Sequence, residues 1–376
     1  MSGSSDFTSI VFYIAIFAIV LFCFHKGEKS EKDRMWSYAG LVVLILVSGL
    51  RFDIGNDYQN YYYSLSRTIN MVKIGSMRQL LAVNFLAGNE PATMLLCFIF
   101  QSFRDGFAWV LAVYSTVTIY LWYKILQREK GLFWGFFIII VFGILFTTYD
   151  QVRQAMAVTL MIYAIKYVES GRLNKFLLCF GIAFCVHYSA LFVGWCYLLK
   201  FVRPRVKIYI ALILVLYAGF VMGVWSKFLP RIFQIADIYA GYASNKKYVM
   251  VNETSSGLGF LAKVLLMTFV MYKTAKRKPL IANYLFVGIC AFIFASGNLN
   301  MWRMAYYFTW AIIPGFPIAM KAIPKKQQGF KIGLALFLSA WFIYDMTKDS
   351  SGCIPYDSVF SENFEFHNLR DRTYMK

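Results

Sequence analysis

The sequence predicts an all-α polytopic membrane protein, a bundle of about 10–12 transmembrane helices that includes short or re-entrant segments. Hydrophobic residues make up 59% of the chain and charged residues only 15%, whereas a soluble domain carries about 25% charged residues. Uncharged apolar runs recur along the chain, and a bilayer core of about 30 Å takes roughly 20 such residues as a helix. Short basic clusters separate these runs, as expected where cytoplasmic loops join membrane helices.

The first apolar run, Phe7–Phe24, is predicted to form a retained helix over residues 8–24. Asp6 precedes the run, whereas Lys26 and Lys29 follow it. A signal peptide has the opposite order, with positive charge first and a small-residue cleavage site after. We therefore expect the N-terminus to lie outside the membrane.

Six basic clusters orient the other helices, because the positive-inside rule places Lys and Arg on the cytoplasmic face. Each interval between clusters must then cross the membrane an even number of times. The short segment 91–103 is expected to lie laterally or to re-enter, and residues 176–199 are expected to form two short helices hinged near His187. The clusters lie within residues 26–34, 124–130, 166–175, 200–207, 273–278 and 321–331. The expected crossing pairs are 36–50 with 107–123, 132–149 with 154–168, 208–225 with 259–272, and 280–297 with 304–320.

The domain organisation is predicted to be one transmembrane helical domain over residues 1–346. The last helix of this domain is expected over 332–346, and residues 347–376 are expected to form an extracytoplasmic tail. Two outer loops, 51–90 and 226–258, are too long to be simple turns.

Charge and cysteine usage exclude several other classes. The net charge of +19 fits the cytoplasmic-loop bias of a membrane protein, so no nucleic-acid partner is expected. The cysteines form no CxxC pair, and only three histidines are present. Neither a disulfide framework nor a metal site is indicated.

Polar residues gather at the predicted outer face, on the opposite side from the basic clusters that orient the helices. It costs free energy to place three arginines, several acids and one histidine at one level of the membrane, unless they line a water-filled cavity. Each has a simpler interpretation when taken alone: arginines can snorkel to headgroups, tyrosines can form an interfacial belt, and His187 can be a packing residue. The four positions are Arg51–Tyr58 with the tyrosines that follow, Tyr149–Gln154, His187–Ser189, and Asn298–Arg303 leading into Tyr306 and Tyr307.

This combination of residues favours the handling of a diphosphate. Arginine offers a permanently charged fork that pairs with two phosphate oxygens at once. A histidine or carboxylate nearby could take the proton from an attacking sugar hydroxyl, and aromatic faces could hold sugars. No Asp-x-Asp pair occurs, so a metal-bound nucleotide sugar has no obvious ligands, and a lipid-linked diphosphate is the more natural donor.

The same residues resemble the motifs of the EpsG-like family of Wzy-type polymerases, which build exopolysaccharide, capsule or O-antigen. The resemblance covers roughly residues 30–345, and it depends on the order and spacing of four short elements. The tail after residue 346 is not assigned by these motifs. The elements are Arg51 with Gly55-x-Asp57-Tyr58 and Tyr61; Arg153-Gln154 with Ala157; Ile182-Ala183-Phe184 with His187-x-Ser189-Ala190-Leu191; and Arg303 with Tyr306-Tyr307-Phe308.

The resemblance implies a metal-independent glycosyltransferase that needs no cofactor and that resembles the GT-C-like membrane glycosyltransferases in fold. Such an enzyme transfers a growing glycan from undecaprenyl diphosphate to another lipid-linked repeat unit. It implies location in the bacterial inner (plasma) membrane, with the active site facing the periplasm or cell exterior. Among site residues it implies catalytic roles for His187, Asp57, Arg153 and Arg303. Substrate-binding roles are expected for Arg51, Tyr58, Tyr61, Glu90, Asp150, Gln154, Asn300 and Tyr306, with Glu90, Asp150 and Gln154 ranked second.

Alternative functions stay open from the sequence. A flippase for the same lipid-linked oligosaccharide would show two related halves and charges spread along a central passage. An O-antigen ligase would use nearly the same chemistry on a different acceptor, and a membrane acyltransferase would need histidine near the cytoplasmic side, where only His25 is expected. A purely structural membrane protein leaves the gathered polar residues unexplained. Expected partners are the lipid-linked glycan donor and acceptor, the bilayer, a flippase and a chain-length regulator.

Overall fold

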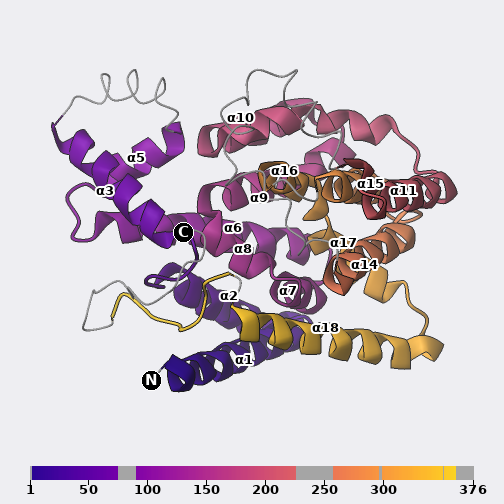
Figure 1. The fold of residues 1–376 in the computed structure, drawn as a ribbon, viewed down its shortest axis with the longest axis horizontal. Helices are drawn as coiled ribbons and strands as arrows, with labels where there is room; N and C mark the ends of the chain where they lie inside the picture. The colour runs from indigo at the N-terminus through magenta and orange to yellow at the C-terminus, as the bar shows by residue number, and fades with distance from the viewer. Residues whose placement is uncertain (1, 75–89, 226–256, 296–298, 350, 361–376) are drawn as a thin grey trace. The chain divides into compact units, whose positions relative to one another are not determined.

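The computed structural model describes residues 2–74, 90–225, 257–295, 299–349 and 351–360 (Figure 1). Most of these residues are helical, and no strand occurs among them. One isolated antiparallel bridge joins Arg51 to Ser358. The predicted polytopic helical bundle is confirmed. Most of the outer loop 226–258, part of the outer loop 51–90 and the end of the tail lie outside the described residues.

The described chain divides into two compact units. The first contains Met1–Tyr163, Cys179–Tyr188 and Ile323–Lys376, and the second contains Ala164–Leu178 and Ser189–Ala322. The prediction of one transmembrane domain followed by an extracytoplasmic tail stays a prediction. The elements that begin in the first unit are α1 (Ser2–Gly27), α2 (Arg34–Gly49), α3 (Tyr58–Ile74), α5 (Pro91–Ile99), α6 (Gly106–Arg128), α7 (Leu132–Val141), α8 (Ile144–Asp150), α9 (Val152–Glu169) and α18 (Gln328–Lys348). The 3₁₀ helix η2 (Tyr188–Phe201) begins at the last residue of a first-unit segment, and the rest of it belongs to the second unit. Those that begin in the second are α10 (Leu173–Val186), α11 (Val206–Val221), α14 (Leu258–Thr274), α15 (Pro279–Phe294), α16 (Leu299–Thr309) and α17 (Ile312–Lys321).

Three described helical segments are long and apolar enough to cross a membrane on their own: Phe7–Gly27, Gly106–Arg128 and Lys325–Lys348. A fourth span results if α7 and α8 are counted together, and several apolar helices are shorter. The predicted outer loop 51–90 also contains a helix, α3, which sequence reasoning missed because its many tyrosines and polar residues give no continuous apolar run.

In the first unit, α1 packs against α2, α7 and α18, and α2 packs against α6 (Figure 1). α3 and α5 pack against each other and against α6. Beyond α18 the chain folds back, and residues 352–359, here called the strap, run beside the loop 51–57. Within the first unit, the segment after the last helix is therefore hydrogen-bonded to the loop that follows α2.

A bend at Gly143 divides the predicted helix 132–149. The axes of α7 and α8 differ by 57°, and Gly143 between them has a φ of +74°. Side chains disfavour this left-handed conformation, whereas glycine adopts it readily. The bend redirects the chain just before α9 begins.

The 3₁₀ helix η2 begins directly after His187 and explains how a short segment covers a long distance. The helix break near His187 is confirmed, because α10 ends at Val186 and η2 starts at Tyr188. At about 2.0 Å per residue, the 14 residues of η2 extend about 28 Å, close to the roughly 30 Å of a bilayer core. The double crossing expected for this region stays a prediction. The buried residues of η2 recur every third position, as a 3₁₀ helix requires: Ala190, Val193, Cys196 and Leu199.

In the second unit the predicted helix 304–320 is broken at Trp310 and Ala311. Pro314 has no N–H to donate to the Trp310 carbonyl, so the ladder of helical hydrogen bonds is interrupted at this point. The helix therefore ends as α16 and restarts as α17. α15 packs against both, and α14 packs against α15 and α17.

Gly288 sets the close approach of α15 and α16. A Cβ at this position would lie 2.7 Å from the Thr309 nitrogen, and backbone cannot move aside as a flexible side chain can. We expect Gly288→Ala to destabilise the protein by about 1–3 kcal/mol and to lower its melting temperature in detergent. Gly181→Ala on α10, where nothing lies within 4 Å, is the control and should not lower it. Equal melting temperatures for the two variants would contradict this packing.

Candidate active site

Glu90 directly precedes α5, and its side chain does not cap that helix. Its backbone is extended, with φ −73° and ψ 139°, as expected for a residue that precedes a proline. Pro91 takes the first helical position, where its missing N–H costs nothing. The Glu90 carboxylate makes no capping bond, so it is available to other partners although the residue is only 3% exposed.

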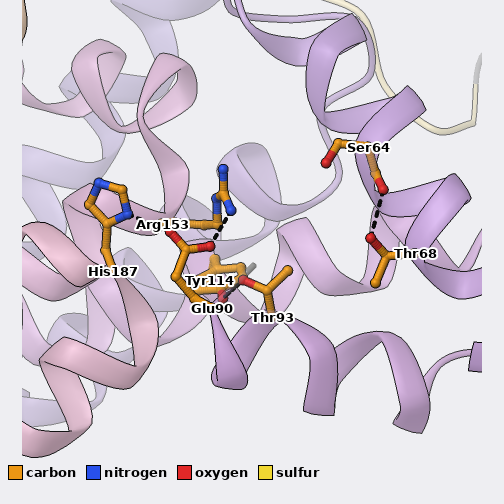
Figure 2. A network of polar contacts seen from close by, with 7 residues as sticks. All are labelled: Ser64, Thr68, Glu90, Thr93, Tyr114, Arg153 and His187. Carbon is orange, nitrogen blue, oxygen red and sulfur yellow. Dashed lines mark hydrogen bonds and ion pairs between the residues drawn. The ribbon is translucent and has the colours of Figure 1, made fainter. Parts of the chain in front are cut away.

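Two basic side chains share this carboxylate, and Figure 2 shows Glu90 between them. Arg153 Nη1 donates to Glu90 Oε2, and His187 Nδ1 lies 2.7 Å from Glu90 Oε1. Arg153 comes from the first turn of α9, and His187 from the break between α10 and η2. One buried carboxylate therefore holds a guanidinium and an imidazole that come from separate segments of the chain.

The charge on Glu90 is maintained by these two partners. Burial raises the pKa of the Glu90 carboxyl. The His187 hydrogen bond and the Arg153 charge together lower this pKa by more than burial raises it, so that it lies below its usual value. A carboxyl whose pKa is lowered by folding stabilises the folded protein at pH values above its unfolded-state pKa. This stabilisation is lost as the pH falls through the folded-state pKa. Glu90 is therefore ionised at neutral pH, and the ion pair weakens only in acid.

The Glu90 contact determines which nitrogen of His187 carries the proton. An ionised carboxylate can only accept hydrogen bonds, so the neutral imidazole must donate from Nδ1. Nε2 then keeps its lone pair, and among the described residues it makes no hydrogen bond. The backbone of His187 is fixed by its own N–H, which donates to Ala183 O over 2.9 Å. The side chain is 28% exposed, so Nε2 can receive a proton from a bound molecule.

Arg153 has donors beyond the one that Glu90 uses. The guanidinium presents five N–H groups, and its Nε is buried without a partner in the described part of the chain. The Tyr61 ring lies 5.7 Å from the guanidinium carbon, and the Arg153 side chain is 28% exposed. An anion that approaches the exposed part of the guanidinium can therefore pair with Arg153 while the contact to Glu90 persists.

A second polar pair anchors the helix that Glu90 precedes. Thr93 Oγ1 and the Tyr114 hydroxyl lie 2.8 Å apart and are both buried, and Figure 2 shows them beside Glu90. This pair connects α5 to α6. It was missed by sequence reasoning, because a single Thr and Tyr in apolar helices carry no spacing signal.

Arg51 was expected to bind substrate, and the structure places it in the interior. It is 2% exposed. Its Nη1 donates to Ser48 O and, over 2.9 Å, to Ser115 Oγ, and its guanidinium carbon lies 4.5 Å from the Tyr149 ring centroid. These three partners all belong to the first unit, and a substrate-binding role for Arg51 stays a prediction.

The acids and tyrosine near Arg51 organise the loop that it begins. Asp57 is half-buried at the start of α3, and its Oδ1 accepts from Asn60 Nδ2 over 3.3 Å. Tyr58 is buried, and its hydroxyl donates weakly to the Arg51 carbonyl over 3.5 Å. Asp150 Oδ1 accepts from the Asn56 N–H over 2.5 Å. Asp57 thus bonds within its own turn, whereas Asp150 connects the loop to α8, and the functional roles of both stay predictions.

The remaining predicted residues are distributed over both units. Gln154 is buried on α9 beside Arg153. Arg303 and Tyr306 are half-buried on α16 in the second unit, and Asn300 belongs to the same helix. The side chain of Asn300 lies outside those described. The expectation that Arg303 shares one cavity with Arg153 and His187 stays a prediction.

Of all predicted site residues, the structure brings together Glu90, Arg153, His187 and Tyr61. Glu90 has only a second-tier rank from the sequence, yet it is the residue that joins Arg153 to His187. The Glu-Pro pair at a helix start was the available signal, because it leaves the carboxylate uncommitted. Within the described residues, no group of three or more His, Cys, Asp and Glu is placed to hold a metal ion, and metal-independent chemistry stays a prediction.

Comparison with known proteins gives one match. The EpsG family model matches residues 34–358, from the start of α2 into the strap. No match was found among curated proteins or solved structures. The family points to a membrane protein of polysaccharide biosynthesis and to a glycosyltransferase-like polymerase. Because the match covers most of the sequence, the chain belongs to the EpsG family.

Proposed function

We propose that this protein polymerises undecaprenyl-diphosphate-linked oligosaccharide repeat units in the bacterial inner membrane, with its active site facing the periplasm or cell exterior. The single observation that supports this most is the Glu90 carboxylate shared by Arg153 and His187. It combines a proton acceptor with an anion-binding group, which are the two functions that transfer from a diphosphate to a hydroxyl needs.

In the proposed step, the acceptor hydroxyl oxygen bonds to the anomeric carbon of the donor glycan. The bond from that carbon to the diphosphate oxygen breaks, and the diphosphate leaves with the electron pair. The hydroxyl proton passes to His187 Nε2. The imidazolium that forms is stabilised by Glu90, to which Nδ1–H already donates, as in other histidine–carboxylate pairs.

Arg153 is proposed to bind the leaving diphosphate. Negative charge develops on the diphosphate oxygens as the glycosidic bond breaks, and a guanidinium nearby lowers the energy of that state. The guanidinium of Arg153 is suited to phosphate oxygens because its N–H donors form a rigid fork. Arg303 is proposed as a further contact to the diphosphate or glycan, and Tyr61 as an aromatic surface for a sugar.

We expect His187→Gln to reduce polymer formation by about 10²–10⁴-fold, the usual contribution of a general base. Gln preserves a hydrogen bond to Glu90 but has no lone pair on nitrogen to accept the proton. The assay uses purified protein in lipid nanodiscs with the lipid-linked repeat unit isolated from cells that lack the protein. His25→Gln, whose ring contacts Phe133, is the matched control. Near-normal polymer from His187→Gln would remove the base from this mechanism.

The lipid-linked glycans of cells lacking the protein distinguish the remaining functions. A polymerase defect leaves single repeat units on the carrier or on the final acceptor. Repeat units confined to the cytoplasmic leaflet would instead identify a flippase, and long unattached chains would identify a ligase. Either result would overturn the proposed function.

A further inference from the structure

The strap is hydrogen-bonded along the loop 51–57 in the first unit. The Phe52 N–H donates to Asp357 O over 3.0 Å, the Val359 N–H donates to Leu50 O over 2.9 Å, and the Gly55 N–H donates to Gly352 O over 2.8 Å. With the antiparallel bridge between Arg51 and Ser358, these bonds hold the loop along most of its length. A segment that follows the last helix thus fixes a loop that follows α2.

The strap is itself anchored to the helices. Tyr356 donates from its hydroxyl to Val47 O over 3.1 Å and from its backbone to Ser9 Oγ over 2.9 Å, and its ring stacks on Phe12 at 4.5 Å. Burial raises the pKa of Tyr356 to about 12, so its hydroxyl stays a donor at neutral pH. At the start of the strap, Asp349 Oδ1 accepts from the Cys353 and Ile354 N–H groups over 2.6 and 3.1 Å.

The loop 51–57 in turn packs closely against residues 149–150, where α8 ends just before α9 begins. A Cβ on Gly55 would lie 2.9 Å from Tyr149 O, and the φ of Gly55 is +101°, so only glycine fits this approach. The next residue, Asn56, donates its N–H to Asp150 Oδ1 over 2.5 Å. Asp150 ends α8, and Arg153 lies in the first turn of α9.

We propose that the strap is a positioning element for Arg153, because it holds the loop 51–57 against the corner from which α9 projects Arg153 toward Glu90. This inference rests on the proposed function, since it assigns the strap a role in transfer. Misplacement of a binding group by about 1 Å can cost about 10²-fold in rate, so a remote anchor can matter for catalysis. The EpsG family match extends to residue 358, and it therefore includes the strap up to the residue that bridges Arg51.

Asp349 offers a variant that loosens the strap without touching the site. We expect Asp349→Ala to lower kcat/KM for the lipid-linked donor by about tenfold, an intermediate displacement effect. Asp349→Asn keeps the Oδ1 acceptor and tolerates the left-handed backbone at this position, where φ is +41°, so it should retain activity within about twofold. Asp345→Ala, an exposed position on α18, is the matched control and should behave as the wild type.

Hydrogen exchange separates positioning from general loss of structure. In Asp349→Ala, exchange should rise in peptides covering residues 51–57 and 149–153 and stay unchanged in α14 and α15. Unchanged exchange at 149–153 in Asp349→Ala, or exchange that rises throughout the protein, would overturn the route through the loop.

Measurement of activity then tests whether the contacts from the strap through the loop 51–57 to residues 149–153 affect transfer. Faster exchange at 149–153 with wild-type kcat/KM in Asp349→Ala would overturn the role in transfer while leaving the proposed function standing. Failure of the proposed function has a different signature, because the wild-type protein would then form no polymer from the isolated lipid-linked repeat unit.

Discussion

Glu90→Gln is expected to reduce polymer formation by about 100-fold or more, since a base held in the wrong tautomer or orientation loses most of its effect. Gln has the shape of Glu but carries one donor where both Arg153 and His187 require an acceptor. The amide must therefore turn its NH₂ group toward one of them. Arg153 also loses the charge of its partner in a mostly buried site, so a lower melting temperature should accompany the loss of activity.

Two further variants make the Glu90 test specific. Glu90→Asp keeps the charge and should retain more activity than Glu90→Gln, although its shorter side chain weakens one of the two contacts. Glu31→Gln removes an exposed carboxylate that pairs with Arg34 over 3.8 Å, and it should leave activity unchanged. If Glu90→Gln formed polymer at the rate of Glu31→Gln, the shared carboxylate would have no part in transfer.

Arg153→Ala is the second variant for which we expect a large effect, a loss of about 10²–10³-fold in kcat/KM for the lipid-linked donor. It removes the proposed diphosphate contact and leaves the Glu90 carboxylate with one partner. Arg153→Lys can still neutralise Glu90 but lacks the planar fork, so it should recover stability more than activity. Steady-state kinetics and melting temperature, measured on the same preparations, separate the two effects.

A double-mutant cycle tests whether Arg153 and Glu90 act together. Because the two side chains share an ion pair, their coupling energy in stability should lie within about 0.5–3 kcal/mol, and the double variant should be less impaired than the sum of the singles. Arg104→Lys, at an exposed arginine that pairs with Asp105 over 3.6 Å, is the control. Strict additivity of Glu90→Gln and Arg153→Ala would contradict the ion pair, and normal donor kinetics in Arg153→Lys would contradict bidentate phosphate binding.

Helix positions followed from the sequence where apolar runs were continuous. The helices predicted over 8–24, 36–50 and 107–123 correspond to α1, α2 and α6, because a run of uncharged apolar residues has few alternatives in a bilayer. The break at His187 was also predicted, since 24 residues had to turn back. The 3₁₀ geometry of η2 was not predicted. Its buried residues recur at every third position from Ala190 to Leu199, and this spacing was present in the sequence.

The candidate site was predictable only in part. Arg153 and His187 could be named because an arginine and a histidine beside apolar runs are costly without a reason. Arg51 has the same chemical character, yet the structure buries it on Tyr149 under the strap. Residue type alone cannot distinguish an arginine that faces a ligand from one that holds a loop, because the difference lies in what the rest of the fold places around it.

The sequence by itself determined that this protein is a membrane-embedded helical bundle, because that property depends on composition and on runs of neighbouring residues. Tertiary structure decided that Glu90 lies between Arg153 and His187 and that the strap returns to the loop 51–57. Both depend on contacts between residues far apart in the chain. Such contacts depend on where the chain changes direction, as it does at Gly143 and at His187, and a pattern of neighbouring residues does not give the distance between segments far apart in the chain.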